Sequence, residues 1–130
     1  MSAHILDVEG LRIVELPAEG PLLREAADLL GLAWEHQASM VAVPAARLGD
    51  DFFTLSTGIA GELVQKCVNY RVRLTILGDI SGHVANSRAL KGFVYESNLG
   101  NHLWFLEDRE ALVARLTRRS PSSGAAPTQG

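Results

Sequence analysis

Residues 40–43 read Met-Val-Ala-Val, a run without a polar side chain, and Pro44 follows directly. A strand covered on one face alternates apolar and polar residues, so an unbroken apolar run favours a strand buried on both faces. Residues 71–77, Arg-Val-Arg-Leu-Thr-Ile-Leu, alternate first and become apolar before Gly78. We predict that these two segments are neighbouring parallel strands, and the rest of the fold depends on this pairing.

The segment between these strands predicts a loop followed by a helix over residues 58–70. Ser56 or Thr57 is the expected N-cap, because Ser and Thr hydroxyls accept hydrogen bonds from free amides at helix starts. Helical spacing gives the helix an inner stripe of Ile59, Leu63, Cys67 and Tyr70. It also gives a polar stripe of Glu62, Gln65, Lys66 and Asn69.

Outward from this centre, the pattern predicts strands alternating with helices. A hairpin of His4–Val8 and Leu11–Leu16 turns at Glu9-Gly10. Residues 22–37 form an amphipathic helix with apolar positions Leu22, Leu23, Ala26, Leu29, Leu30, Ala33 and Trp34. After a loop over 79–86 come a helix from Ser87 to about Ser97, a strand over His102–Leu106, and a helix from Asp108 to about Thr117. The expected fold class is α/β, a mixed five-stranded sheet with an N-terminal hairpin and about four helices.

Composition limits the classes of function. A chain of 130 residues with 47% hydrophobic residues fits one domain, expected over residues 1–117, and the Ser-, Pro- and Gly-rich residues 118–130 predict a disordered tail. The net charge of −3 argues against a nucleic-acid partner. The sequence shows neither a membrane span nor a signal peptide, and its single Cys67 agrees with a reducing compartment, so we expect a cytoplasmic protein without a membrane partner.

A site is expected where the carboxyl ends of the parallel strands meet, because the loops there converge on one edge of the sheet. The loops are residues 44–57, residues 78–86 and the corner at 107–108. His83, in a polar loop, has the ordinary chemistry of a general acid or base, with Asp79 or Asp50 as its carboxylate partner. An apolar cleft of Phe52, Phe53 and Tyr70 would stand beside it. The simpler interpretation is that His83 is a solvated loop residue.

Other candidates point away from metals and cofactors. His4, His36 and His102 are too dispersed for metal-ligand spacing, and Cys67 lies on the apolar stripe, so we expect no metal, no cofactor and an inert thiol. Thr57-Gly58 at a helix start would offer free amides to an anion or a phosphorylated hydroxyl. The simpler interpretation is that the hydroxyl only caps the helix. The pairs Arg71 with Arg73 and Arg88 with Lys91 are interpreted as solvated basic spots.

A long block of residues resembles a known family. The block reads Asp51-Phe52-Phe53-x-Leu55-x-Thr57-Gly58-x-Ala60-Gly61-Glu62-x-x-Gln65-Lys66-x-x-Asn69-Tyr70-Arg71-Val72-Arg73, with Gly78-Asp79 and Glu96-Ser97-Asn98-x-Gly100 downstream. It resembles the small bacterial single-domain proteins of domain of unknown function family 4180, over about residues 4–116. That resemblance implies no established activity.

The order of elements is also similar, more distantly, to STAS domains, the sulfate transporter and anti-sigma-factor antagonist modules. In that family a Ser or Thr before a Gly at this helix start is phosphorylated by a partner kinase, which switches binding. The resemblance places that position at Ser56 or Thr57, with Leu55 standing where the family carries an acid. It implies a STAS-like fold.

These observations leave two main functions open. The first is a STAS-like interaction or regulatory module that binds a protein partner or a second copy of itself. Its surface would include Ser56, Thr57, Gly58, Glu62, Gln65, Asn69 and Tyr70. The second is a small enzyme or small-molecule-binding protein of bacterial metabolism, secondary metabolism included, with His83 and Asp79 or Asp50 as acid and base.

Overall fold

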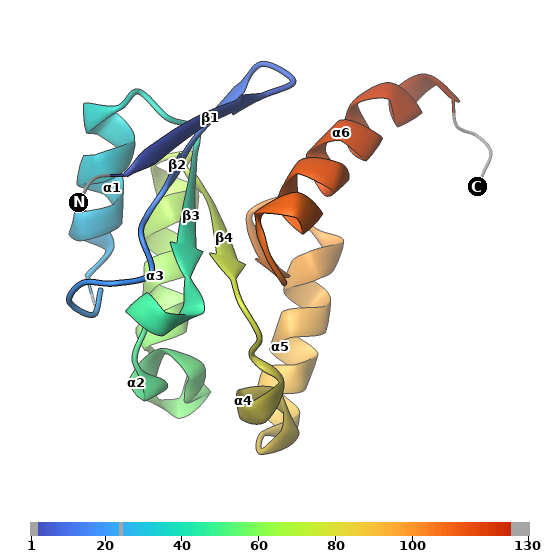
Figure 1. The fold of residues 1–130 in the computed structure, drawn as a ribbon. Coiled ribbons are helices and arrows are strands. Elements are labelled where there is room, and N and C mark those ends of the chain that lie inside the picture. Colours follow the sequence, from blue (N-terminus) through green and yellow to red (C-terminus); the bar gives the residue numbers. More distant parts are fainter. Residues whose placement is uncertain (1–2, 24, 126–130) are drawn as a thin grey trace.

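The computed structural model describes residues 3–23 and 25–125. Its centre is a five-stranded mixed sheet in the order β1-β2-β3-β4-β5. The strands are β1 (His4–Val8), β2 (Leu11–Glu15), β3 (Met40–Pro44), β4 (Arg73–Leu77) and β5 (Leu103–Leu106). The β1–β2 hairpin is antiparallel and the other pairings are parallel, as predicted (Figure 1).

The pairing of β3 with β4 confirms the prediction on which the fold depends. Met40 lies opposite Arg73 and Pro44 opposite Leu77, so the two strands end together. Consequently the segments that follow Pro44 and Leu77 leave the sheet at the same edge. We call this the carboxyl edge, and the opposite one, where β3 to β5 begin, the amino edge.

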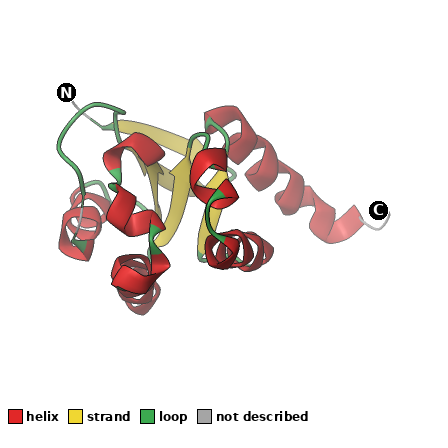
Figure 2. Ribbon diagram, turned by 90° about the horizontal axis from the view of Figure 1, so that it is seen from below, coloured by secondary structure: helices red, strands yellow, loops and turns green. Residues whose placement is uncertain are grey.

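The helices cover the two faces of the sheet unequally. Alternate strand residues such as Val41 and Val43 pack on the helices α1 (Ala26–Glu35), α3 (Ile59–Asn69) and α5 (Arg88–Leu99). Met40, Ala42 and Trp104 point to the other face and pack on α6 (Arg109–Ala125). Figure 2 shows α6 alone on its side of the sheet. Burial on both faces explains why β3 contains only apolar residues.

The strand order also explains why the helices gather on one face. Each right-handed crossover from β2 to β5 steps to the next strand in the same direction, which keeps the connecting helices on one side. Because the direction never reverses, the sheet has no topological switch point, the usual position of a crevice in doubly wound folds. Any cavity at the carboxyl edge is therefore built from loops and short helices.

Several predicted boundaries were wrong. The predicted loops contain short helical turns: η1 (Ala45–Arg47), α2 (Asp50–Phe53), η2 (Leu55–Thr57) and α4 (Ser81–Ala85). Such elements are too short to show a helical period in the sequence. The predicted helix over 22–37 begins only at Ala26, because the Leu23 amide donates to the Arg47 carbonyl at 2.8 Å and keeps the preceding segment out of the helix.

The last helix is longer than predicted. Its start is confirmed, since the Asp108 carboxylate accepts from the Ala111 amide at 2.9 Å. The backbone of α6 remains helical to Ala125, whereas the sequence predicted an end near Thr117 and disorder from residue 118. Residues 126–130 lie outside the described residues, so the prediction of disorder there stays a prediction.

Candidate functional site

The carboxyl edge holds a cavity of about 540 Å³, which we call the carboxyl-edge cavity. The ends of β3 and β4 form its floor. Its lining residues are Ala18, Pro44, Ala45, Ala46, Leu48, Asp50, Leu77, Gly78, Asp79 and His83. The three candidates for acid–base chemistry, His83, Asp79 and Asp50, thus line one cavity, although they come from separate segments of the chain.

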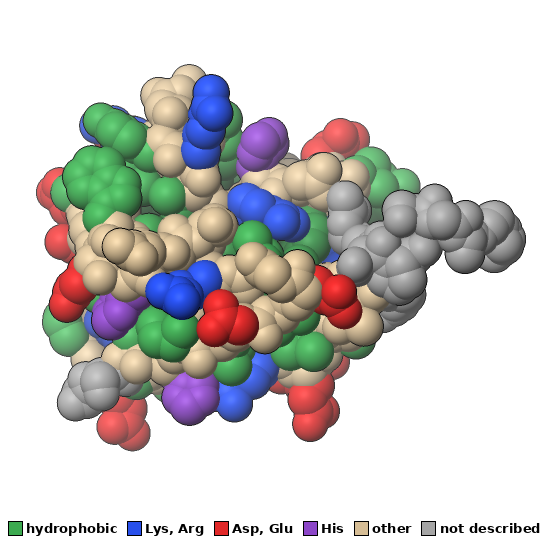
Figure 3. Space-filling view, turned by 90° about the horizontal axis from the view of Figure 1, so that it is seen from above, with side chains coloured by type: hydrophobic (Ala, Val, Ile, Leu, Met, Phe, Trp, Pro, Cys, Tyr) green, Lys and Arg blue, Asp and Glu red, His purple; other side chains and the backbone are tan. Residues whose placement is uncertain are grey.

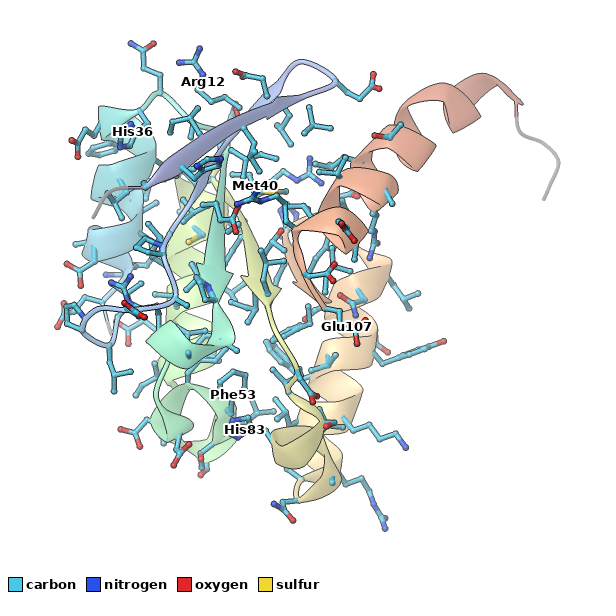
Figure 4. The ribbon with its side chains drawn as sticks, in the orientation of Figure 1. Arg12, His36, Met40, Phe53, His83 and Glu107 are labelled. Atoms are coloured by element: carbon cyan, nitrogen blue, oxygen red, sulfur yellow. The ribbon has the colours of Figure 1, made fainter. Side chains whose placement is uncertain are left out.

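The His83 ring is held by an aromatic contact. It lies parallel to the ring of Phe53, with 4.2 Å between ring centroids and 11° between the planes (Figure 4). Phe53 is buried and meets Phe52 edge to face at 5.1 Å. The His83 imidazole therefore stacks on Phe53, and Phe52 in turn packs against Phe53. The predicted third member of this cleft, Tyr70, is not there, because it lies at the other end of α3.

The two carboxylates do not orient His83. One oxygen of Asp79 accepts from the Ser81 amide at 2.9 Å, across the start of α4. This bond and a second one from the Ser81 hydroxyl hold the pKa of Asp79 below its ordinary value of 3.8. Asp50 is exposed at the start of α2. Within the described residues, no hydrogen bond or ion pair joins either carboxylate to His83, so its acid–base role stays a prediction.

A buried arginine that the sequence analysis did not single out, Arg47, stabilises one wall of the carboxyl-edge cavity. Arg47 is only 8% exposed, and its guanidinium donates to the carbonyls of Pro21 at 2.8 Å, Pro17 at 3.0 Å and Glu19 at 3.4 Å. These bonds fix the segment that connects β2 to α1, including Ala18 of the cavity. Sequence reasoning had no signal for Arg47, because its partners are backbone carbonyls 26–30 positions away.

A second cavity, of about 460 Å³, continues along the same edge toward β5. It shares Ala18, Pro44, Leu77 and Gly78 with the carboxyl-edge cavity. Its polar groups include Glu107, labelled in Figure 4, and the ion pair of Arg109 Nε with Glu15 Oε1 at 2.7 Å. The corner at 107–108 therefore lies at the same edge as the other two predicted loops, and the paired Arg109 lines the same cavity.

The segment Ser56-Thr57-Gly58 is built for a tight turn into α3. Gly58 is the N-cap, at φ 82°, a left-handed conformation that favours glycine, so the predicted N-cap position was wrong by one or two residues. The Thr57 hydroxyl accepts from the Ile59 amide at 3.2 Å, and it lies 2.8 Å from the carbonyls of Asp51 and Thr54 as a donor. Ser56 is exposed. Phosphorylation of either hydroxyl stays a prediction.

A third cavity, of about 400 Å³, is the groove between α1 and α3. We call its surface the α1–α3 face, lined by Glu25, Ala26, Ala27, Leu30, Gly31, Trp34, Ile59, Glu62, Leu63, Lys66 and Tyr70. Of the predicted partner-binding residues, Glu62 and Tyr70 line it. Gln65 and Asn69 are exposed on α3 but do not line the groove, and the segment 56–58 lies before the helix.

Two aromatic residues on this face correct the sequence analysis. Tyr70 was predicted on the buried stripe and Trp34 on the buried positions of its helix, yet they are 53% and 63% exposed. Their rings meet edge to face with centroids 5.7 Å apart. Trp34 directly follows the buried Ala33, so it stands at the margin of the apolar stripe of α1. Helical spacing alone does not tell whether a residue at that margin is buried or exposed.

The structure also places the single cysteine and the histidines that were considered as metal ligands. Cys67 is buried on α3, and burial raises the pKa of its thiol to about 11, so it carries no thiolate at neutral pH. Within residues 3–23 and 25–125, no three His, Cys, Asp or Glu side chains gather closely enough to hold a metal ion. No helix in the described part of the chain is long and apolar enough to cross a membrane.

Comparison with known proteins gives one match. The model of the family described as Domain of unknown function (DUF4180) matches residues 8–116, which is most of the chain. No curated protein and no solved structure matches at a significant level. The resemblance seen in the sequence block 51–73 is therefore confirmed at the level of this family, whereas the STAS-like resemblance is not.

Proposed function

The chain belongs to the DUF4180 family, whose description assigns no activity, and from the geometry we propose that it is an interaction module that pairs with a second copy of itself. The proposed interface is the α1–α3 face. The observation that carries the proposal is the exposed aromatic pair Trp34 and Tyr70, which stands at the end of the groove.

The aromatic pair supports a protein partner because of its area and its rigidity. Tryptophan and tyrosine are enriched among the residues that dominate binding energy, and they lose little conformational freedom on binding. Here each ring already steadies the other by an edge-to-face contact. The groove beside them, which includes Leu30 and Ile59, offers an apolar floor to an incoming side chain.

The charges on the same face favour a second copy as that partner. Glu62 and Lys66 are one helical turn apart on α3, and both line the groove. In a two-fold interface each patch meets itself, so a two-fold axis between the two positions would set Glu62 of each chain opposite Lys66 of the other. A face that carries both signs one turn apart is complementary to itself, whereas a face of one sign would repel its copy.

The experiment that tests this proposal is sedimentation equilibrium of the full chain. Trp34→Ala is expected to weaken self-association by about 30-fold, the effect of losing a central aromatic contact of ~2 kcal/mol. Tyr95→Ala is the matched control, because Tyr95 is 64% exposed but stands on α5, away from the groove. Its association constant should equal that of the wild type.

Two results would overturn the proposal. One is a wild-type chain that remains monomeric up to millimolar concentration. The other is equal loss of association in the Trp34 and Tyr95 variants, which would show that any exposed aromatic residue contributes and that the α1–α3 face is not the interface. Circular dichroism of each variant confirms that the fold is intact.

A further inference from the structure

A cavity of about 370 Å³ lies at the amino edge of the sheet, opposite the sites described above. It is formed where α3 ends and where β4 and β5 begin. Its lining residues are Val68, Arg71, Val72, Arg73, Asn101 and His102. We call it the amino-edge cavity. Figure 3 faces this end of the molecule and shows basic side chains and a histidine close together around a hollow.

Basic side chains make up half of the lining of this cavity. Arg71, Arg73 and His102 contribute basic groups, Asn101 contributes an amide, and none of the lining residues is acidic. The sequence separates these residues by about 30 positions, so its two arginines were interpreted as a solvated basic spot. Pairing of β4 with β5 brings them together, with Leu74 opposite Leu103.

The neighbouring helix ends do not cancel this charge. The C-termini of α3 and α5 both lie at this edge, and each carries about −0.5 elementary charge from its backbone dipoles. Two such ends amount to roughly −1, against two arginines that are always protonated. The two arginine charges therefore outweigh the charges of these two helix ends.

Arg73 is held in place for binding. Its Nε donates to the Asn101 carbonyl at 2.9 Å, and its guanidinium lies over the Trp104 ring, 4.8 Å from the centroid. A second arginine, Arg115, covers the same ring at 4.0 Å. The aromatic ring thus fixes the guanidinium plane of Arg73, which lowers the ordering cost of binding an anion.

Arg71 occupies a position that the backbone reserves for glycine. It follows the last turn of α3 at φ 62°, and the Val72 amide closes the helix by donating to the Cys67 carbonyl at 2.9 Å. A left-handed residue at this place is usually glycine, because any side chain is strained there. Among the described residues, no side-chain hydrogen bond or ion pair engages Arg71. Its side chain therefore adds no such bond to the folded state that would offset the backbone strain.

From these contacts we infer that the amino-edge cavity binds the phosphate monoester group of a small molecule. The cavity is lined by two guanidinium groups, the kind of donor that matches the several oxygens of a dianionic phosphate. The volume of the cavity falls in the range of small-ligand sites. This inference is independent of self-association through the α1–α3 face.

The position of Arg71 allows a variant that separates binding from folding. Arg71→Gly removes the charge and relieves the left-handed strain, so its unfolding temperature should equal or exceed that of the wild type. Gln37→Gly is the matched control, because Gln37 follows α1 at φ 54° in the same kind of helix end but does not line the cavity. It should gain stability and keep binding.

The test is a titration of the full chain with phenyl phosphate, followed by NMR shifts of the Asn101 and His102 amides. We expect saturable shifts in the wild type and in Gln37→Gly, and at least a tenfold weaker Kd in Arg71→Gly. Dimethyl phosphate, a monoanionic diester, and acetate should each bind at least tenfold more weakly than phenyl phosphate.

Three outcomes would overturn the inference. They are the absence of saturable shifts in the wild type, unchanged binding in Arg71→Gly, and binding of the diester or acetate as strong as that of the monoester. A fall in stability of Arg71→Gly would also count against it, since Arg71 would then be compensating the end of α3. The binding measurements do not use self-association as their readout, and the unfolding temperatures are compared at one protein concentration, so failure here leaves the proposed interface untouched.

Discussion

The carboxyl edge and the α1–α3 face differ in how their side chains are engaged. At the carboxyl edge, Arg47 donates to three carbonyls, Asp79 closes a helix start, and the His83 ring rests on Phe53. On the α1–α3 face, Trp34 and Tyr70 contact each other and remain more than half exposed.

The difference concerns which groups orient the candidate residues, and it leaves the acid–base role of His83 a prediction. His83, Asp79 and Asp50 line one cavity, but the Asp79 carboxylate is engaged at the start of α4 and the His83 ring is stacked on Phe53. General acid–base catalysis needs an oriented proton path, which geometry decides. The aromatic pair, in contrast, leaves apolar rings exposed to water, which is the observation behind the proposed interface on that face.

Among the variants of the carboxyl edge, Arg47→Ala is expected to lose the most stability. Hydrogen bonds from a charged donor contribute ~1.5–3 kcal/mol each when well formed, and the freed carbonyls here are near the surface and accessible to water. We therefore expect a loss of about 3 kcal/mol in the free energy of unfolding, measured by urea denaturation at one protein concentration.

Arg12→Ala provides the control for this measurement. Arg12 forms an exposed ion pair with Asp7, with 3.5 Å between Nε and Oδ1, which predicts a loss below ~1 kcal/mol. Equal losses in the two variants would show that Arg47 does not brace the carboxyl edge, and the contrast between the two regions would then disappear.

A smaller effect is expected from the pH dependence of Asp79. Hydrogen bonds lower its pKa in the folded chain, so the folded state binds its proton less readily than the unfolded state. Its stabilising contribution is therefore complete above the ordinary pKa of 3.8 and is lost as pH falls through the lower folded value. Asp79→Asn keeps an acceptor oxygen for the Ser81 amide but does not titrate.

The variant should consequently lose less unfolding free energy than the wild type when the pH falls from about 5 to about 3. Chemical denaturation at both values measures the difference. Identical pH profiles of the two proteins would mean that the Asp79 carboxylate is not engaged at the start of α4.

The sequence was sufficient for the sheet because its signal there is local and periodic. The apolar run at 40–43 and the hairpin turn at Glu9-Gly10 each predicted the observed strands. The sequence was not sufficient where the burial of a side chain depends on a segment far away in the chain, or where no segment covers the side chain. Arg47 is buried by carbonyls of another segment, and Trp34 is exposed although its spacing is that of a core residue. The amino-edge cavity was missed because the rule for parallel sheets directs attention to the opposite edge.

The most direct test of the proposed interface is a cross-linking experiment between two variants. A tagged Glu62→Cys chain is mixed with an untagged Lys66→Cys chain and treated with a short thiol-specific cross-linker. The native Cys67 does not interfere, because it is buried and its pKa is raised to about 11. A tagged Tyr95→Cys chain mixed with the same Lys66→Cys chain is the control.

If two copies pair through the α1–α3 face, the Glu62→Cys and Lys66→Cys mixture gives a tagged–untagged dimer that the Tyr95→Cys mixture lacks. A yield equal to that of the control would show that two copies do not pair through the α1–α3 face.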